Sequence, residues 1–429
     1  MEGLGFRPYE TYKDSRVAWI GSIPSTWDVQ RAKWLFKRMD RPVRPEDDIV
    51  TCFRDGEVTL RSNRRTDGFT TALKEIGYQG IRKDDLVIHA MDAFAGAIGV
   101  SDSDGKATPV YSACVPRQPN TVDPNFYAYY MRHLALSGFL VSLAKGIRER
   151  STDFRFNDFA ELEIPFPSLP EQRAIVAFLD EKCAKADGAV KIKEEQIALL
   201  RERRHIIIQD AVTHGINPSA PMKDSCIDWI GQIPAHWEVK RGKFLFAKVD
   251  RPVRTQDDIV TCFRDGQVTL RSNRRVEGFT NALKEHGYQG IRKGDFIIHA
   301  MDAFAGAIGV SDSDGKATPV YSVCVPKVEN TVDPHFFAQL MRQIALSGLL
   351  VSLAKGIRER STDFRYGDFA SLLLVVPPLP EQKEITAYIQ AVSERIENGI
   401  EIKRRQIMVL KEYKTSLINA AVTGKIKIV

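Results

Sequence analysis

One stretch of the chain, residues 171–216, constrains the fold most because it reads as a single long helix. It contains no proline, and apolar side chains recur along it at gaps of three, four and seven residues. That spacing is typical of a helix with one apolar seam. The seam consists of Ile175, Leu179, Ala186, Val190, Ile197, Leu200, Ile207 and Ala211, interrupted by Lys193 and Arg204. A helix of about 43 residues extends roughly 65 Å, and its apolar stripe needs a partner.

The partner lies later in the same chain, where residues 381–426 repeat the pattern at an offset of 210. The equivalent seam consists of Ile385, Ile389, Ile396, Ile400, Ile407, Leu410, Leu417 and Ala421. We therefore expect the two helices to pair in a coiled coil. An antiparallel pair places one copy at each end, whereas a parallel pair requires residues 217–240 to run back along the helix.

The repeat extends over nearly the whole chain without an insertion. Trp27 recurs as Trp237, and residues 88–112 are identical over all 25 positions to residues 298–322. The two helical stretches, in contrast, agree at only 15 of 46 positions. Packing alone tolerates apolar exchanges. Identity that includes turn and surface residues therefore indicates either a surface that both copies must present or gene conversion restricted to that segment.

Each copy is predicted to be a mixed α/β (α+β) globule followed by a long helix. Apolar runs and turn residues predict strands, and Asp123-Pro124 predicts the start of a helix. The expected strands cover residues 48–53, 57–63, 86–91, 97–100 and 109–115, and the expected helices cover 125–136 and 139–145. The expected domains are a globule at 1–170, a helix at 171–216, a globule at 217–380 and a helix at 381–429. The predicted fold is thus two globules joined by two long antiparallel helices, with a pseudo-twofold internal repeat.

Composition sets the broad class of protein. The chain has 429 residues, 43% of them hydrophobic, which is enough for more than one domain with a real core. No apolar run approaches the length of a membrane span, so we expect a cytoplasmic protein. The six cysteines form no Cys-x-x-Cys pair, which favours reduced, buried thiols. A net charge of +6 and a pI of 8.9 permit nucleic-acid binding without requiring it.

The chain lacks a convincing catalytic or metal-binding motif. Gly99 to Lys106 resembles a phosphate loop, but five residues separate its glycines and Ala107 follows where a hydroxyl residue must bind magnesium. His89 and His299 lie in apolar strands with no second ligand at a typical spacing. We therefore predict neither an enzyme nor a metal site.

Two polar, basic clusters recur in both copies and are the candidate DNA contacts. An arginine fork suits guanine or phosphate, and an asparagine amide suits adenine. The candidates are Arg61, Asn63, Arg64, Arg65, Lys106, Lys145, Arg148, Arg150 and Ser151, with Arg271, Asn273, Arg274, Arg275, Lys316, Lys355, Arg358, Arg360 and Ser361. The alternative is a solvated face with ion pairs to Glu57, Asp67, Glu149 and Asp153. Retention of the clusters while the helices diverge favours DNA contact. Met91, Asp92, Phe94, Lys106 and Tyr111 lie in the fully identical block and are left open between base or sugar contact and a core or turn role.

The segment Trp19-Ile20-Gly21-Ser22-Ile23-Pro24 resembles the entry to a target recognition domain in the specificity subunits of type I restriction–modification systems. The segment from Pro377 to Gln382, with Ile385 after it, resembles the family's P-P-L-x-E-Q-x-x-I join. The segment from Ala421 to Gly424 resembles the A-V-T-G end of the family's helix. The first copy departs slightly, with Ser168 in its join and His214 in place of the glycine.

The resemblance implies that each globule reads one half of a bipartite double-stranded DNA site. It also implies that the helices act as a ruler and dock two adenine methyltransferase subunits. Helix pairing and docking are assigned to Ile197, Leu200, Ile207, Ile407, Leu410 and Leu417. The resemblance places S-adenosylmethionine in the methyltransferase partner and ATP and Mg in a possible pair of restriction subunits, with no cofactor in this chain. Because the two copies are nearly identical, we predict a nearly palindromic target. A stand-alone DNA-binding regulator and a scaffold that binds only proteins are the alternatives.

Overall fold

The chain divides into two compact units, and the computed structural model describes residues 6–64, 76–143, 153–274, 287–350 and 363–428. The first unit comprises residues 1–194 and 404–429, and the second comprises residues 195–403. Each unit therefore contains one globule together with a segment of each long helix. The two long helices are α5 (Leu169–His214) and α10 (Leu379–Val422).

The first unit is built around a four-stranded antiparallel sheet in the order β4-β11-β8-β9. Four antiparallel strand pairs accompany it: β1-β2, β3-β12, β5-β6 and β7-β10. The strands are β1 (Tyr12–Asp14), β2 (Ser22–Pro24), β3 (Asp28–Arg31), β4 (Phe36–Met39), β5 (Val50–Cys52), β6 (Val58–Leu60), β7 (Gln79–Ile81), β8 (Leu86–His89), β9 (Ile98–Val100), β10 (Gly105–Ala107), β11 (Tyr111–Pro116) and β12 (Glu163–Phe166).

Short helices cover this sheet, and their ends follow the sequence signals. The helices are α1 (Ala32–Leu35), α2 (Pro124–Leu136), α3 (Phe139–Leu143) and α4 (Phe156–Glu161), with 3-10 turns η2 (Arg61–Asn63) and η3 (Ala93–Ala95). Asp123 Oδ1 accepts a hydrogen bond from the Asn125 amide at 2.9 Å, as expected of a helix N-cap. The helix α2 packs against β8 and β9, and Trp27, Phe126 and Tyr127 are fully buried in the core.

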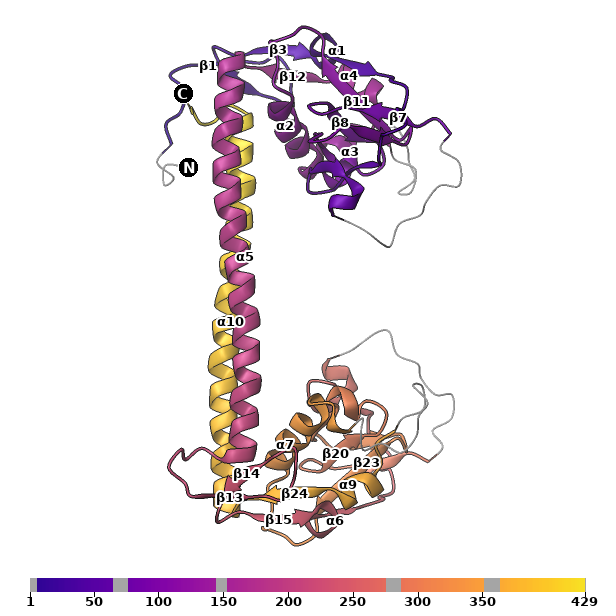
Figure 1. Cartoon of the computed structure of the whole chain (residues 1–429), viewed down its shortest axis with the longest axis vertical. Coiled ribbons are helices and arrows are strands. Elements are labelled where there is room, and N and C mark those ends of the chain that lie inside the picture. Colours follow the sequence, from indigo (N-terminus) through magenta and orange to yellow (C-terminus); the bar gives the residue numbers. More distant parts are fainter. Residues whose placement is uncertain (1–5, 65–75, 144–152, 275–286, 351–362, 429) are drawn as a thin grey trace. The chain divides into compact units, whose positions relative to one another are not determined.

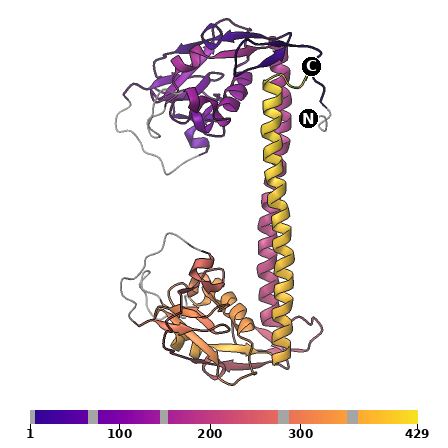
Figure 2. The ribbon, with the colours of Figure 1, turned by 180° about the vertical axis from the view of Figure 1, so that it is seen from behind.

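The last part of α10 completes the core of the first unit. Leu417, Ala421 and Val422 are buried in the same cluster as Trp27. Both views show this part of α10 beside the first part of α5 (Figures 1 and 2). The two segments are antiparallel, because Lys414 contacts Asp187 whereas Lys427, beyond the end of α10, shares a pocket with Glu171 near the start of α5.

The second unit repeats the first, with the two long helices exchanging roles. Its four-stranded sheet has the order β16-β23-β20-β21. The strands are β13 (Met222–Asp224), β14 (Gln232–Pro234), β15 (Glu238–Arg241), β16 (Phe246–Lys248), β17 (Val260–Cys262), β18 (Val268–Leu270), β19 (Gln289–Ile291), β20 (Phe296–His299), β21 (Ile308–Val310), β22 (Gly315–Ala317), β23 (Tyr321–Pro326) and β24 (Leu373–Val376). The helices are α6 (Gly242–Leu245), α7 (Pro334–Leu346) and α9 (Tyr366–Ser371), with η4 (Arg271–Asn273) and η5 (Ala303–Ala305).

In the second unit the end of α5, rather than of α10, completes the core. Ala211 and Val212 are buried beside Trp237. Arg204 of α5 contacts Glu397 of α10, and Gly215, just past the end of α5, lies beside Glu381 near the start of α10, so the segments are antiparallel here as well. The predicted pairing of two long helices, the mixed α/β globules and the internal repeat are therefore confirmed.

Some predicted details were wrong. The strand expected over residues 57–63 ends at Leu60, because Arg61–Asn63 form a 3-10 turn whose Asn63 side chain bonds back to Thr59 Oγ1 at 2.8 Å. Thr59, whose hydroxyl accepts this bond, is buried. The expected burial of all the cysteines fails at Cys226, which is exposed, whereas the other five are buried and all six are free thiols.

In the described part of the chain, no helix is both long enough and apolar enough to cross a bilayer.

Candidate nucleic-acid interface

A polar recess lined by three arginines lies at one end of the β17-β18 hairpin in the second unit. Its volume is about 470 Å³. We call it the arginine recess, and its lining residues are Thr261, Cys262, Phe263, Arg264, Asp265, Arg271, Arg274 and Asp302. The equivalent residues of the first unit are Thr51, Cys52, Phe53, Arg54, Asp55, Arg61, Arg64 and Asp92. The recess gathers two of the predicted candidates, Arg271 and Arg274, with a third arginine that sequence analysis did not single out.

The local fold explains how the hairpin turn is held. Gly56 has φ +91°, in the left-handed region that favours glycine. Its amide donates to the Phe53 carbonyl at 2.9 Å. The Arg132 guanidinium of α2 donates to the carbonyls of Gly96 at 3.1 Å and Arg54 at 3.4 Å. Burial lowers the pKa of Arg132. Arg132 thus ties the turn that carries Arg54 to the helix behind it.

Arg64 and Arg274 are anchored by stacking and by carboxylates. Each guanidinium lies 4.3 Å from the centre of a phenylalanine ring, Phe53 in the first unit and Phe263 in the second. Arg64 Nη1 lies 2.7 Å from Asp55 Oδ2 and 2.8 Å from Glu57 Oε2. Arg274 Nη1 lies 2.7 Å from Asp265 Oδ2.

The two copies differ in charge at this point. Gln267 occupies the position equivalent to Glu57. Arg64 therefore contacts two carboxylates, Asp55 and Glu57, whereas Arg274 contacts the carboxylate of Asp265, so the two arginines are not electrostatically equivalent. Ion pairs of this kind, including the one with Glu57, are what the alternative interpretation as a solvated face predicts. Side chains held by partly exposed carboxylates still exchange partners readily, because such pairs are worth little in water.

The remaining members of the first cluster have well-defined positions. Arg61 Nε donates to Thr51 Oγ1 at 3.2 Å, and Arg271 Nε donates to Thr261 Oγ1 at the same distance. Asn63 is exposed, but its amide nitrogen is bonded to Thr59, and Asn273 repeats this contact with Thr269 at 2.8 Å. These bonds use the amide nitrogen of each asparagine and do not involve its amide oxygen.

A tight turn after β8 lies beside the recess. The Asp92 amide donates to His89 Nδ1 at 3.0 Å, and Arg54 Nη2 lies 2.9 Å from Asp92 Oδ1. The same two distances recur at His299, Asp302 and Arg264. Burial lowers the pKa of His89 and of His299, which favours the neutral ring that accepts this bond. Each histidine thus lies at the end of its strand with a backbone amide as its hydrogen-bond partner.

Four of the five residues whose roles the sequence left open have distinct surroundings in the structure. Tyr111 is buried against the His89 ring, with ring centres 4.6 Å apart, and burial raises its pKa to about 12. Phe94 packs against the core beside Phe154. Asp92 pairs with Arg54. Met91, in contrast, is 64% exposed, so the core role fails for it.

Other candidates lie away from the recess or outside the described residues. Lys106 and Lys316 are half-buried on β10 and β22, where their amides donate to the carbonyls of Asp48 and Asp258 at 2.8 Å. The candidates that fall outside the described residues are Arg65, Lys145, Arg148, Arg150, Ser151, Arg275, Lys355, Arg358, Arg360 and Ser361.

The helix-pair candidates lie on the seam to different depths. Ile197 and Leu417 are buried, and Leu417 also belongs to the core of the first globule. The other four, Leu200, Ile207, Ile407 and Leu410, are half-buried. A carbon added at Gly399 would lie 3.8 Å from Leu200 Cδ1, so Leu200 faces the paired helix within the second unit.

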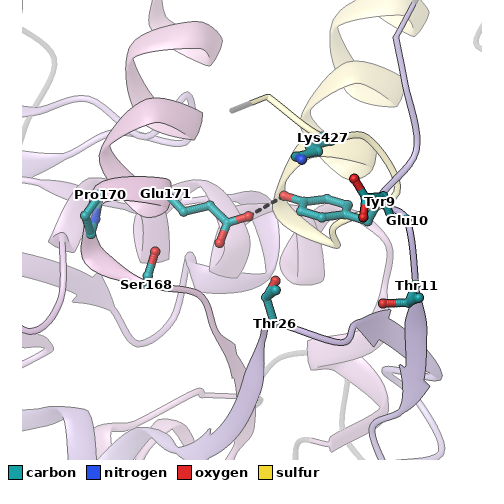
Figure 3. Close-up of a pocket in the computed structure, with 8 residues that line it drawn as sticks. All are labelled: Tyr9, Glu10, Thr11, Thr26, Ser168, Pro170, Glu171 and Lys427. Atoms are coloured by element: carbon teal, nitrogen blue, oxygen red, sulfur yellow. Dashed lines mark hydrogen bonds between the residues drawn. The ribbon is translucent and has the colours of Figure 1, made fainter.

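A second pocket marks the junction of globule and helices in the first unit. Its volume is about 390 Å³, and Figure 3 shows Tyr9 pointing toward Glu171 across it. Tyr9 Oη donates to Glu171 Oε1 at 2.6 Å, and burial, reinforced by Glu171, raises the tyrosine pKa. In the second unit the equivalent carboxylate, Glu381, lies 2.7 Å from His236 Nε2. The glutamate of the join motif thus fastens helix to globule in both units, by different partners.

Neither pocket carries a catalytic constellation. Within the described ranges, no group of three or more His, Cys, Asp or Glu side chains is arranged to hold a metal ion. The thiols of Cys52 and Cys262, the nucleophile candidates nearest the arginines, have pKa values raised by burial, which opposes thiolate formation.

Known proteins resemble this chain over its whole length. It is 21% identical over 458 residues to the putative type I restriction enzyme MjaX specificity subunit of Methanocaldococcus jannaschii, covering 99% of each chain. It is 26% identical over 324 residues to the MjaVIII specificity subunit of the same organism, covering 72% of each chain. No family model matches the sequence.

Solved structures share the fold. One is a chain from work on complex assembly and conformational transition of the type I R-M system, with a TM-score of 0.64 and 14% identity over 93% of this chain and 98% of that one. Another is the HsdS subunit from Thermoanaerobacter tengcongensis, with a TM-score of 0.53 and 16% identity over 94% and 98% of the two chains. The relatives are specificity subunits, which confirms the prediction of a non-catalytic subunit. The chain is thus similar in sequence to specificity subunits of type I restriction enzymes, over nearly its full length in one case, and it shares the fold of solved type I restriction–modification chains.

Proposed function

We propose that each globule of this chain reads one half of a bipartite DNA site and that residues 1–170 and 217–380 are its target recognition domains. The observation that carries the proposal is the arginine recess. It presents three guanidinium groups beside polar side chains, and the turn next to it belongs to the 25 residues that are identical in both copies. Arginine forks fit guanine edges and phosphates. A DNA substrate is also consistent with the cytoplasmic location predicted from the sequence.

The two half-sites are nearly inverted repeats of each other. A protein whose two reading surfaces carry the same side chains reads the same bases with each. Between residues 47–64 and residues 257–274, which carry the hairpin, Glu57 against Gln267 is the single difference. An exchange of a carboxylate for an amide beside a retained arginine alters affinity more readily than base choice. We therefore expect equal or closely related half-sites.

The long helices set the spacer between the half-sites and dock two adenine methyltransferase subunits. Their seam residues serve the helix pair, which leaves the outer helix surface for partners. S-adenosylmethionine belongs to those partners, and ATP and Mg to a pair of restriction subunits where these are present. This chain supplies recognition without chemistry, which fits the raised thiol pKa values beside the recess.

Methylome sequencing of cells that express this chain with its methyltransferase partner tests the proposal. The expected result is adenine methylation in two related, inverted half-sites with a fixed unspecified spacer. Two clearly unrelated half-sites would overturn the palindrome and leave DNA recognition standing.

A gel shift with and without the methyltransferase partner separates the three classes of function. The proposal predicts that the partner greatly strengthens specific binding. Tight specific binding by the purified chain alone would identify a stand-alone regulator. No DNA affinity at moderate salt, even with the partner, would identify a protein-binding scaffold.

A further inference from the structure

Met91 and Met301 are exposed apolar side chains next in sequence to Asp92 and Asp302, and Asp302 lines the arginine recess. Met91 is 64% exposed and Met301 is 61% exposed. Both lie in the block that is identical between the copies, at equivalent positions. An isolated exposed apolar residue needs no explanation, but this one immediately precedes an aspartate that is paired with an arginine of the recess, and it does so twice.

The backbone that carries Met91 is fixed on both sides. The Ala90 amide donates to the Val110 carbonyl at 3.0 Å, and the Ala90 carbonyl accepts from Phe154 at 2.9 Å. After it, the Asp92 amide is bonded to His89, and the Asp92 carbonyl accepts from Ala95 and Ala97 at 3.0 and 3.1 Å. The second unit repeats these bonds around Met301. A thioether held out on a fixed turn has little backbone entropy to lose on binding.

We propose that Met91 and Met301 each contact the 5-methyl group of a thymine in the major groove of their half-site. This inference rests on the proposed DNA recognition and adds a base-reading residue to it. The thymine methyl is the apolar feature of the major groove, and apolar side chains recognise it. The thioether is flexible and polarisable, so it adapts to that small target.

The neighbouring carboxylate favours the major groove over the minor groove. Asp92 and Asp302 follow the methionines directly, and each carries a partly exposed carboxylate. The minor groove has an enhanced negative potential where it is narrow, which opposes entry of a carboxylate. The major groove presents the amino groups of cytosine and adenine, and an aspartate carboxylate can accept hydrogen bonds from these groups. Insertion of methionine as a wedge between base steps is therefore the less favourable geometry.

The experiment uses the complex of the full chain with its methyltransferase partner and the DNA motif found by methylome sequencing. Each thymine of the site is replaced in turn by uracil, which removes only the methyl group. Wild-type complex should lose affinity about fourfold at one thymine per half-site, as expected for burial of one methyl group. The variants Met91→Gln and Met301→Gln should each abolish the uracil effect in one half-site only.

Matched variants separate contact from folding. Met91→Leu keeps an apolar side chain and should retain most of the binding and of the thymine dependence. Because the side chain is largely exposed, Met91→Gln should leave the unfolding midpoint of the chain unchanged.

Three outcomes decide the matter. If the glutamine variants lose binding but the wild-type complex shows no uracil effect, methionine acts as a wedge between base steps, and thymine readout is overturned. Unchanged binding in the glutamine variants would overturn the inference while leaving the proposed function intact. A wild-type complex that binds no DNA specifically would overturn the proposed function itself.

Discussion

Lys414 of α10 lies 2.7 Å from Asp187 of α5, and the equivalent positions, Arg204 of α5 and Glu397 of α10, lie 3.3 Å apart. An offset of 210 residues converts one pair into the other while exchanging the helices that supply acid and base. Both residue types differ between the pairs, but the signs of the charges are kept. The helix pair has thus diverged in sequence while keeping an acid–base pair at the equivalent position in each unit.

This register predicts a measurable coupling in the first unit. Asp187→Lys places two cations together and should destabilise the chain, whereas Asp187→Lys combined with Lys414→Asp restores opposite charges. A double-mutant cycle in urea should give a coupling free energy of about 0.5 kcal/mol, because both side chains are partly exposed. The same exchange at Arg204 and Glu397 is the internal comparison. A coupling free energy of zero in both units would mean that these ion pairs do not help to fix the register in which the two helices pair.

The charge difference beside the recess predicts that the two half-sites are bound unequally. Glu57→Gln removes one of the two carboxylates that contact Arg64 and makes the first unit resemble the second. DNA binding should tighten about two- to fivefold, since an exposed ion pair is worth up to about 1 kcal/mol. Binding of the chain with its methyltransferase partner, measured by fluorescence anisotropy at fixed salt, checks this.

The reciprocal variant supplies the control. Gln267→Glu adds a carboxylate near Arg274 and should weaken binding by a similar factor. The salt slope of binding then shows whether the arginine contacts phosphate, because loss of one phosphate contact lowers the slope by about one unit. If both variants bind DNA with the same affinity as the original chain, neither arginine releases its carboxylate to bind DNA.

Removal of the arginine behind the hairpin should affect both stability and recognition. Arg132→Met leaves the carbonyls of Gly96 and Arg54 without the bonds they accept from the guanidinium. Loss of these bonds at a half-buried site should cost about 1–3 kcal/mol of unfolding free energy. Arg342→Met is the equivalent change in the second unit. Chemical denaturation measures the cost, and a variant as stable as the original would contradict a positioning role.

The helices and the repeat were predictable because their signals are local or periodic. The seam from Ile175 to Ala211 marks a helix whatever surrounds it, and Asp123-Pro124 marks a helix start through its own side chain. The recess was predictable only in part. Arg64 and Arg271 stand out as members of a basic cluster, but Arg54 and Arg132 acquire their roles through contacts distant in sequence. No local pattern reveals that Arg132 holds the Gly96 carbonyl, or that residues 61–63 leave the strand.

Acid pH should weaken each globule through His89 and His299. Burial lowers the folded-state pKa of both rings below the ordinary value of about 6.5. The unfolded chain therefore binds more protons in the window below pH 6.5, so stability rises with pH through that window and is complete above it. Unfolding free energy measured from pH 7 to pH 5.5 should fall.

An asparagine variant isolates this effect. His89→Asn with His299→Asn keeps an acceptor for the amides of Asp92 and Asp302 but removes the titrating group. The variant should show a smaller loss of stability between pH 7 and pH 5.5 than the original chain. An identical loss would assign the pH dependence to other groups, such as His133, whose pKa burial and Lys425 also lower.

If the helices act as a ruler, their length and not the globules determines the DNA spacer. Insertion of seven residues after Lys193 and seven after Lys403 adds one heptad at equivalent positions of both helices and preserves the apolar seam. Seven helical residues add about 10 Å, which corresponds to about three base pairs at about 3.4 Å per pair. Methylome sequencing should reveal unchanged half-sites with a spacer longer by about three base pairs. An insertion in one helix only is the control and should disrupt the pairing. Altered half-sites in the doubly extended chain, or an unchanged spacer, would contradict the ruler.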